Sequence, residues 1–377
     1  MNQDSQEKYR FSATIAQTVL EKIVNEIKPG CSVHALCRYG DELVNAYTKS
    51  VFKNLPDIER GIAFPTTISI NNYIQNFSPD KEDDVLLSPG DLVKIETSAQ
   101  IDGFIGNAAY SYIIPLSMLL TPYDKIYYVT SAAYFALEAG IRLFSPGNTS
   151  TNVINAIQAV ANEFKCSVSE HSYTTHLDRF VFSGKKTFSN SSHTKSASLV
   201  TTFESGDVYS VDVILSTGPG VSKTSEYKPT IFSRNLNKSY QLKLKSSRLL
   251  FSKVCKQRSV FPFLLRDLVE KDARAGLFEC TQNDLLIPYA VSTERNGEYV
   301  AQFKTTVFVH PSGPLRLIAS TKPNLDLPNS IENNEISALL NTPLKQVAPA
   351  SLKSNIKIDP EILDSIQVKS AFSVQKF

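Results

Sequence analysis

The 377-residue chain lacks any uninterrupted apolar stretch of about 18 residues, the length that a membrane-spanning helix needs. Its first residues, MNQDSQEKYR, also lack the apolar core of a secretory signal peptide. Membrane insertion and secretion are therefore not expected. The five cysteines are odd in number and form no CxxC pair, which favours reduced thiols and a cytoplasmic or nuclear protein over a disulfide framework.

Acidic residues are absent from positions 227 to 266, although the formal net charge of the whole chain is only +2. This segment, called here the basic stripe, carries ten basic side chains: Lys228, Arg234, Lys238, Lys243, Lys245, Arg248, Lys253, Lys256, Arg258 and Arg266. Solvated surfaces usually mix both charges. The stripe therefore indicates either a surface for phosphate groups or a region whose balancing acids come from elsewhere in the fold.

The length of 377 residues predicts either one large domain or two smaller ones, and 42% hydrophobic and 20% charged residues are ordinary values for a globular protein. Apolar spacing predicts helices at 8–28, 33–54, 122–143 and 151–164, and a helical block at about 240–286. Strands are predicted after Gly61, at 173–182, 207–215 and 228–233, and in two closing segments ending at His310. Along the chain, a group of helices followed by a group of strands is predicted twice. Residues 323–377 have weak periodicity and predict an irregular tail.

A β-hairpin is predicted for DLVKIETSAQIDGFIGNAAYSYII, residues 91–114, with its turn at Asp102 and Gly103. That turn pairs Glu96 with position 109 and places Asn107 diagonally on the same face, so that Glu96 and Asn107 can meet. Two carboxylates at these positions would form half of a site for divalent metals. Asn107 is neutral, however, and cannot bridge two cations as Asp would.

Two predicted strands begin with the same short sequence pattern. SPGDLVKIE (88–96) and ESGDVYSVD (204–212) share a Gly-Asp turn and an acid six positions after the glycine, Glu96 or Asp212. Two similar halves would place these acids near a shared axis, where binding sites often form. The alternative is two unrelated Gly-Asp turns.

Five segments together resemble the proliferation-associated, ErbB-binding protein family: GIAFPTTISINN, GDLVKIETSAQIDGFIGNAAYSYI, VYSVDVILSTGPG, QLKLKSSR and GEYVAQFKTTVFVHPSGPLRL. The resemblance extends from about Lys8 to about Asp326. It implies a non-catalytic relative of type 2 methionine aminopeptidases with their α+β pita-bread fold. The expected organisation is one pita-bread domain at 1–322 with a pseudo-two-fold repeat, a basic helical insert at about 235–287, and the tail at 323–377.

The resemblance also implies a degenerate metal site, because the aminopeptidases bind two metals through two Asp, one His and two Glu. The positions of this chain that match the ligands, in order, are Glu96, Asn107, Thr175, Asp212 and Lys304, with His176 next to Thr175. A catalytic His of the aminopeptidases matches Asn76. No metal or other cofactor is therefore expected.

Lys304 is the decisive replacement, because it puts an ammonium where two dications would lie. One unit pair at about 4 Å is worth roughly 4 kcal/mol at an effective dielectric near 20, and a dication would feel about double that repulsion. If Lys304 pairs with Glu96 or Asp212, a salt-bridged core replaces the metal cavity. The alternative is that Lys304 points to solvent.

What the resemblance implies for function is binding to the large ribosomal subunit and its RNA near the peptide exit, in ribosome biogenesis or translation control. The expected contacts lie in the basic stripe, at Lys238, Lys243, Lys245, Arg248, Lys253, Lys256 and Arg258. A cytoplasmic protein with nuclear or nucleolar presence would fit. Two alternatives stay open: a metal-dependent methionine aminopeptidase with an atypical site, and a pocket that holds nascent-chain N-termini without cleaving them.

Overall fold

The structure, a computed structural model, describes residues 2–116, 124–191, 200–257, 260–268, 276–318, 321–328, 331–354 and 356–366. The α-helices among them are α1 Gln3–Glu26, α2 Val33–Ser50, α3 Lys125–Ile141, α4 Ser150–Glu163, α5 Lys245–Gln257, α6 Leu277–Gln282, α7 Asn334–Asn341 and α8 Pro360–Ile366. The first four are the helices that the sequence predicts, with ends that differ by a few residues.

Most described strands belong to one large sheet. Its members are β1 Arg60–Ile62, β2 Thr67–Ile70, β4 Leu92–Ile101, β5 Phe104–Ile113, β6 Ser167–Val168, β7 Tyr173–Leu177, β8 Phe188–Ser189, β9 Val208–Ser216, β15 Val300–His310, β16 Gly313–Arg316 and β17 Lys345–Gln346. The main path runs β1-β4-β5-β15-β9-β7-β8. A smaller sheet joins β10 Lys223–Thr224, β14 Ser292–Thr293 and β3 Tyr73–Gln75.

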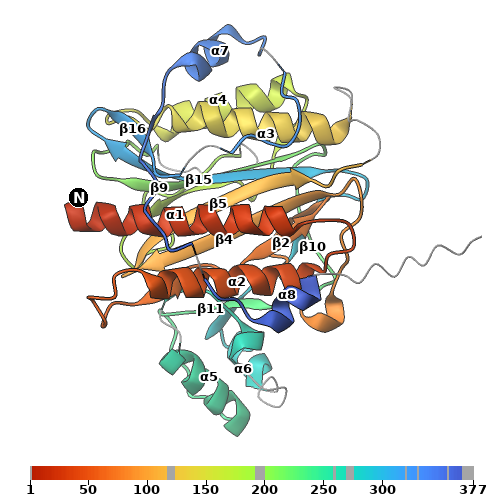
Figure 1. The fold of residues 1–377 in the computed structure, drawn as a ribbon, viewed down its shortest axis with the longest axis vertical. Helices are drawn as coiled ribbons and strands as arrows, with labels where there is room; N and C mark the ends of the chain where they lie inside the picture. The colour runs from red at the N-terminus through yellow and green to blue at the C-terminus, as the bar shows by residue number, and fades with distance from the viewer. Residues whose placement is uncertain are drawn as a thin grey trace, which may run out of the picture.

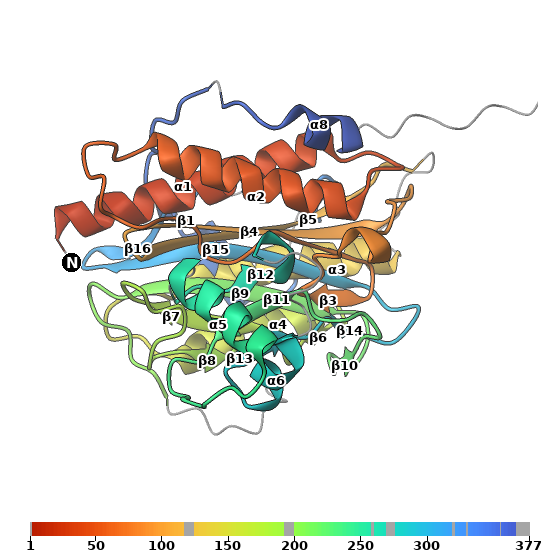
Figure 2. The ribbon, with the colours of Figure 1, turned by 90° about the horizontal axis from the view of Figure 1, so that it is seen from below.

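Helices α1 and α3 cover one face of the central strands (Figures 1 and 2). Thr97 of β4 donates a hydrogen bond to the Ala16 carbonyl of α1, and Phe303 of β15 packs edge-to-face on Tyr134 of α3. Because side chains alternate along a strand, residues 96 and 304 point to the opposite face. We call this the inner face and the helix-covered one the outer face.

The approach of α1 to the sheet depends on Gly106 in β5. A Cβ at this position would lie 2.2 Å from the backbone nitrogen of Ala13. Only glycine therefore allows the helix backbone to lie directly on the strand.

The half with β4 and β5 and the half with β9 and β15 have similar structures, as the shared Gly-Asp pattern predicts. Gly90 and Gly206 both have positive φ, +85° and +104°, at the turns that begin β4 and β9. The Gly90 amide donates to the Ile114 carbonyl at 3.0 Å, and the Gly206 amide donates to the Val309 carbonyl at 2.9 Å. The equivalent hydrogen bonds relate β4 and β5 to β9 and β15, so the alternative of two unrelated turns is wrong.

The insert has its own small core and projects from one end of the body (Figure 1). Its sheet joins β12 Phe263–Leu264, β11 Ile231–Arg234 and β13 Leu286–Tyr289. The expected helical block at 240–286 is therefore wrong in part: within its described residues, only α5 and α6 are α-helical. Pro262 explains the interruption, because proline cannot continue a helix and the chain forms β12 directly after it.

The segment after residue 322 is not simply irregular. It forms α7 and pairs β17 with β16, and its last described element is α8, which packs on α2. Figure 1 shows this segment running from α7 past α1 to α8. Ile336 and Ile362 are buried against the body, so anchoring comes from a few apolar contacts in elements too short to give a visible period.

Among the described residues, none of the helices has both the length and the apolar character that a bilayer crossing requires.

Candidate functional site: a lysine between two carboxylates

The centre of the inner face carries a row of residues in register across four strands. Glu96 of β4 pairs with Ala109 of β5, Ala109 pairs with Lys304 of β15, and Lys304 pairs with Asp212 of β9. The hairpin register predicted from the Asp102-Gly103 turn is confirmed. The row crosses the boundary between the two repeated halves, so each half contributes one acid.

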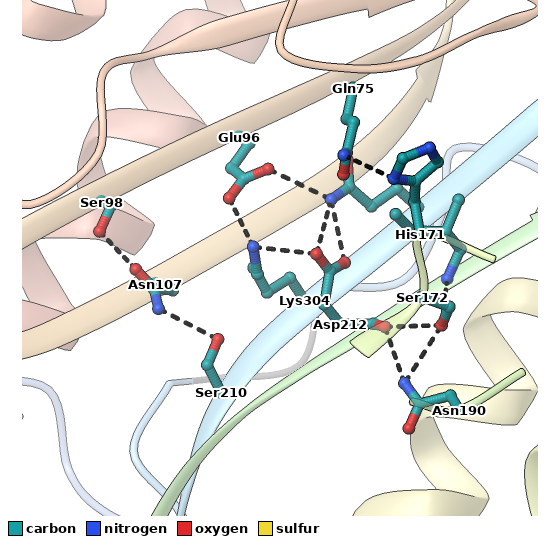
Figure 3. A network of polar contacts seen from close by, with 12 residues as sticks. Gln75, Glu96, Ser98, Asn107, His171, Ser172, Asn190, Ser210, Asp212 and Lys304 are labelled. Atoms are coloured by element: carbon teal, nitrogen blue, oxygen red, sulfur yellow. Dashed lines mark hydrogen bonds and ion pairs between the residues drawn. The ribbon is translucent and has the colours of Figure 1, made fainter. Parts of the chain in front are cut away.

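Lys304 bridges the two acids (Figure 3). Its Nζ lies 2.5 Å from Glu96 Oε1 and 2.9 Å from Asp212 Oδ2. The side chains of all three residues are about 10% exposed. The predicted salt-bridged core is thus confirmed, and the alternative in which Lys304 points to solvent is wrong.

The charges of Glu96, Asp212 and Lys304, called here the trio, depend on one another. Burial acts to lower the pKa of Lys304, but Asp212 and Glu96 outweigh it and hold the pKa above its ordinary value. Burial raises the pKa of Asp212 to about 6, with Lys304 opposing and Glu96 adding to the rise. One cation thus serves two carboxylates, and burial, with the Glu96 charge adding to it, makes Asp212 harder to ionise than an ordinary aspartate.

Gln302 is a fourth member of the cluster that the residue-by-residue comparison with aminopeptidases did not identify. Its Nε2 donates to Asp212 Oδ1 at 2.9 Å and to Glu96 Oε2 at 3.3 Å. Gln302 precedes Lys304 by two positions in the same strand, so the two-residue period already placed it on the same face. It supplies the additional hydrogen bonds that two buried carboxylates need.

Asn107 does not meet Glu96, contrary to expectation. It faces inward, but its Oδ1 accepts from the Ser98 hydroxyl and its Nδ2 donates to Ser210 Oγ at 3.0 Å (Figure 3). The amide has donors as well as acceptors, so two serine hydroxyls satisfy it without an ion.

Two other expected positions lie outside the trio. Thr175 is opposite Ser210 on β9, one strand further out and two residues along from Asp212. His176 points to the outer face, where its ring contacts Tyr209 and its Nε2 lies 3.6 Å from Asp207 Oδ1. His176 and Asp212 therefore point to opposite faces of the sheet and cannot ligate the same metal ion.

Asn76 follows β3 and donates to the Ala290 carbonyl at 3.0 Å. The side chain next to it, Gln75, takes the place expected for Asn76 beside the cluster (Figure 3). Asn76 has a φ of +66°, so the chain turns at this residue and the facing side chain differs by one position.

His171 is a histidine near the trio that the ligand comparison did not select (Figure 3). Gln75 Nε2 lies 3.0 Å from His171 Nδ1, His171 Nε2 lies 2.8 Å from Ser222 Oγ, and Ser222 donates to Glu170. Because the Gln75 amide donates to Nδ1, that nitrogen carries no proton. The imidazole is then neutral, with its proton on Nε2. Burial lowers the His171 pKa, with Glu170 opposing.

The residues present do not fit a pair of divalent metals. The ammonium of Lys304 occupies the space between the carboxylates that would have to ligate them, and a dication there would be repelled. In the part of the chain that the structure describes, no group of three or more His, Cys, Asp or Glu side chains is arranged to hold a metal ion.

The basic stripe is largely at the surface of the insert. Seven of its side chains are exposed: Lys228, Lys238, Lys243, Lys245, Arg248, Lys253 and Lys256. The ion pairs found among the described residues involve none of these seven. Arg266 differs, because it donates to the Ser78 and Pro79 carbonyls and holds the insert to the body. Arg258 lies outside the described residues.

The start of α5 already holds a carboxylate. Glu279 accepts from the backbone amides of Lys243 and Leu244 at 2.7 and 3.1 Å. The hydrogen bond from the Lys243 amide lowers the Glu279 pKa. The two amides just before α5 are therefore already occupied, and the exposed basic side chains are the groups of this region that we consider for phosphate contact.

Comparisons with known proteins agree with this architecture. The model of metallopeptidase family M24 matches residues 7–225. ErbB-3 binding protein 1 from Solanum tuberosum is 36% identical over 90% of this chain and 87% of its own length. Proliferation-associated protein A from Dictyostelium discoideum is 33% identical over 92% and 91%. A solved thermophilic Arx1 structure has a TM-score of 0.81 and 26% identity, covering 92% of this chain and all of that one.

The chain belongs to metallopeptidase family M24. Within it, the identities place the chain in the branch of the proliferation-associated, ErbB-3-binding proteins. The family and the α+β pita-bread fold expected from the sequence are both confirmed.

Proposed function

We propose that this protein is a non-catalytic M24 member that binds the large ribosomal subunit through its RNA, near the peptide exit. The observation that carries the loss of catalysis is the position of Lys304 Nζ, within 3 Å of both remaining acids. A bimetallic hydrolase needs this space for its ions. The competing function, a metal-dependent methionine aminopeptidase with an atypical site, would require Lys304 to leave a buried ion pair.

Support for an RNA partner comes from the insert. The insert projects from the end of the body (Figure 1), and its basic side chains are exposed, so a large folded partner can approach them. Lysine and arginine contacts to RNA phosphates release counterions, so affinity should fall steeply with salt. Structured RNA is recognised largely by shape and backbone, which suits a broad basic surface.

The inner-face cluster makes a poor receptor for nascent-chain N-termini. Glu96 and Asp212 are each 7% exposed, and Lys304 already uses both carboxylates. A peptide ammonium would have to displace Lys304 to bind there. We therefore place the partner surface on the insert, and we propose that the protein acts in the cytoplasm or in the nucleus, where large subunits mature.

The test is co-sedimentation with purified large subunits at low and high salt. The charge-reversal variant Lys243→Glu/Lys245→Glu/Arg248→Glu should lose binding at low salt, and wild type should lose it at high salt. A matched control, Lys49→Glu/Lys53→Glu/Lys353→Glu, makes the same charge change at exposed positions outside the insert. Equal binding by the two variants would show that the insert is not the interface.

A further inference from the structure

A small cavity lies between α1, α3 and strands β5 and β15, and Lys304 of the trio is among the residues that line it. Its volume is about 30 Å³, and its lining includes Gln17, Glu138, Thr305, Arg316 and Thr321. It thus lies where the first half, the second half and the segment after β16 meet.

Arg316 is the main polar group of this cavity. The residue is 2% exposed, and its Nη2 donates to Glu138 Oε1 at 2.6 Å. Its Nε and Nη1, and the Thr305 hydroxyl, have no hydrogen-bond partner within the described residues. Buried guanidinium nitrogens without partners are rare because leaving them unpaired is costly.

The local charge is unbalanced as well. Arg142 Nη1 binds the same Glu138 carboxylate, at 2.9 Å from Oε2, and the Arg142 side chain is only 13% exposed. Two guanidinium groups therefore share one carboxylate beside the cavity. A water could accept a hydrogen bond from Arg316, but it would not offset the net positive charge of Arg142, Arg316 and Glu138 taken together.

We propose that the cavity is a binding site for a small monovalent anion, with chloride as its ligand. The guanidinium of Arg316 has donors and no acceptor, and the Thr305 hydroxyl can turn its proton toward the same point. The cavity is small, about 30 Å³, and has room for a compact ligand such as a single halide ion. The bound anion would join β15 and β16 through Thr305 and Arg316, and Arg316 in turn binds Glu138 of α3.

The direct test is diffraction from crystals of the full chain grown with bromide in place of chloride. We expect an anomalous peak within hydrogen-bond reach of Arg316 and Thr305 in wild type, and no peak there in Arg316→Met. A wild-type cavity that holds only water, or no density, would overturn the proposal.

A solution test keeps the proposal falsifiable if Arg316→Met does not fold. At the same ionic strength, wild type should melt at a higher temperature in chloride than in gluconate, because a ligand of the native state stabilises it. Thr305→Val should reduce this chloride-specific difference. Thr306→Val is the matched control, since Thr306 is buried but bonds to Asn107 on the other face, and it should keep the difference. No chloride effect in wild type, or an equal loss in both variants, would contradict the site.

Discussion

Lys304 and Asp212 lie directly opposite each other on β15 and β9, with 2.9 Å between the ammonium and the carboxylate. Lysine at this position turns a place suited to cations into an internal ion pair. The repeated halves of the fold remain joined there, since Glu96 of the first half takes the other side of the same ammonium.

Removing the lysine alone should destabilise the protein strongly. Lys304→Met leaves two buried carboxylates without their cation, and breaking a buried pair in this way costs about 3 to 5 kcal/mol. Urea unfolding of wild type and variant measures the difference.

The charge-free control is Glu96→Gln/Asp212→Asn/Lys304→Met, which removes both acids together with the lysine. It should recover most of the loss, because no unpaired charge remains. A single variant as stable as wild type would show that the trio is not an internal ion pair in solution.

Neutral His171 should stabilise the protein and mild acid should remove this contribution, whereas the raised pKa of Asp212 acts in the opposite direction. The folded pKa of His171 is lowered by burial, below the ordinary value near 6.5, so the unfolded chain binds the proton more readily. The contribution of His171 is full above pH of about 6.5 and is lost as the pH falls toward the folded pKa. Protonation would also place a hydrogen on Nδ1, so that two N–H donors, those of His171 and the Gln75 amide, would face each other.

The measurement is the urea midpoint from neutral to mildly acidic pH. His171→Gln should lose less stability toward acid than wild type does, whereas the control His310→Gln should behave as wild type, because within the described residues the His310 ring hydrogen-bonds only to nearby Ser312. A loss in His171→Gln equal to that of wild type would contradict the assignment.

The sequence predicted the first four helices, the hairpin register and the repeated Gly-Asp turns, because each depends on local periodicity or turn chemistry. It also predicted that Lys304 could pair with the acids. It could not show that Asn107 turns to Ser98 and Ser210, because strands far apart in sequence set those partners. Likewise, the φ of +66° at Asn76, which places Gln75 beside the cluster, has no visible sequence signal.

The tail should detach when its anchor is made polar. Ile362 in α8 is 1% exposed, and α8 packs on α2. Ile362→Asp would bury a carboxylate, so releasing the short helix is the cheaper outcome. Limited proteolysis should then cut the tail sooner, with faster hydrogen exchange in α2. Glu361→Ala, at an exposed position of the same helix, should behave as wild type. Equal protection of both variants would contradict the docking.

The contact of α1 with β5 should not tolerate a methyl group. Gly106→Ala places a Cβ against the Ala13 backbone, which cannot move without shifting the whole helix. We expect a loss of about 1 to 3 kcal/mol or more in unfolding free energy. Gly140→Ala is the control, because its Cβ would meet side-chain atoms of Ile157 and Val153 no closer than 3.4 Å and helical alanine is favoured. A neutral Gly106→Ala would contradict the close approach.

The most direct test of the central claim is elemental analysis of the purified protein after incubation with manganese, cobalt, iron or zinc, together with an assay for methionine release from a Met-Ala-Ser peptide. The ion trio predicts no stoichiometric metal and no release. Two equivalents of metal with released methionine would show that Lys304 leaves the acids, and would contradict the account.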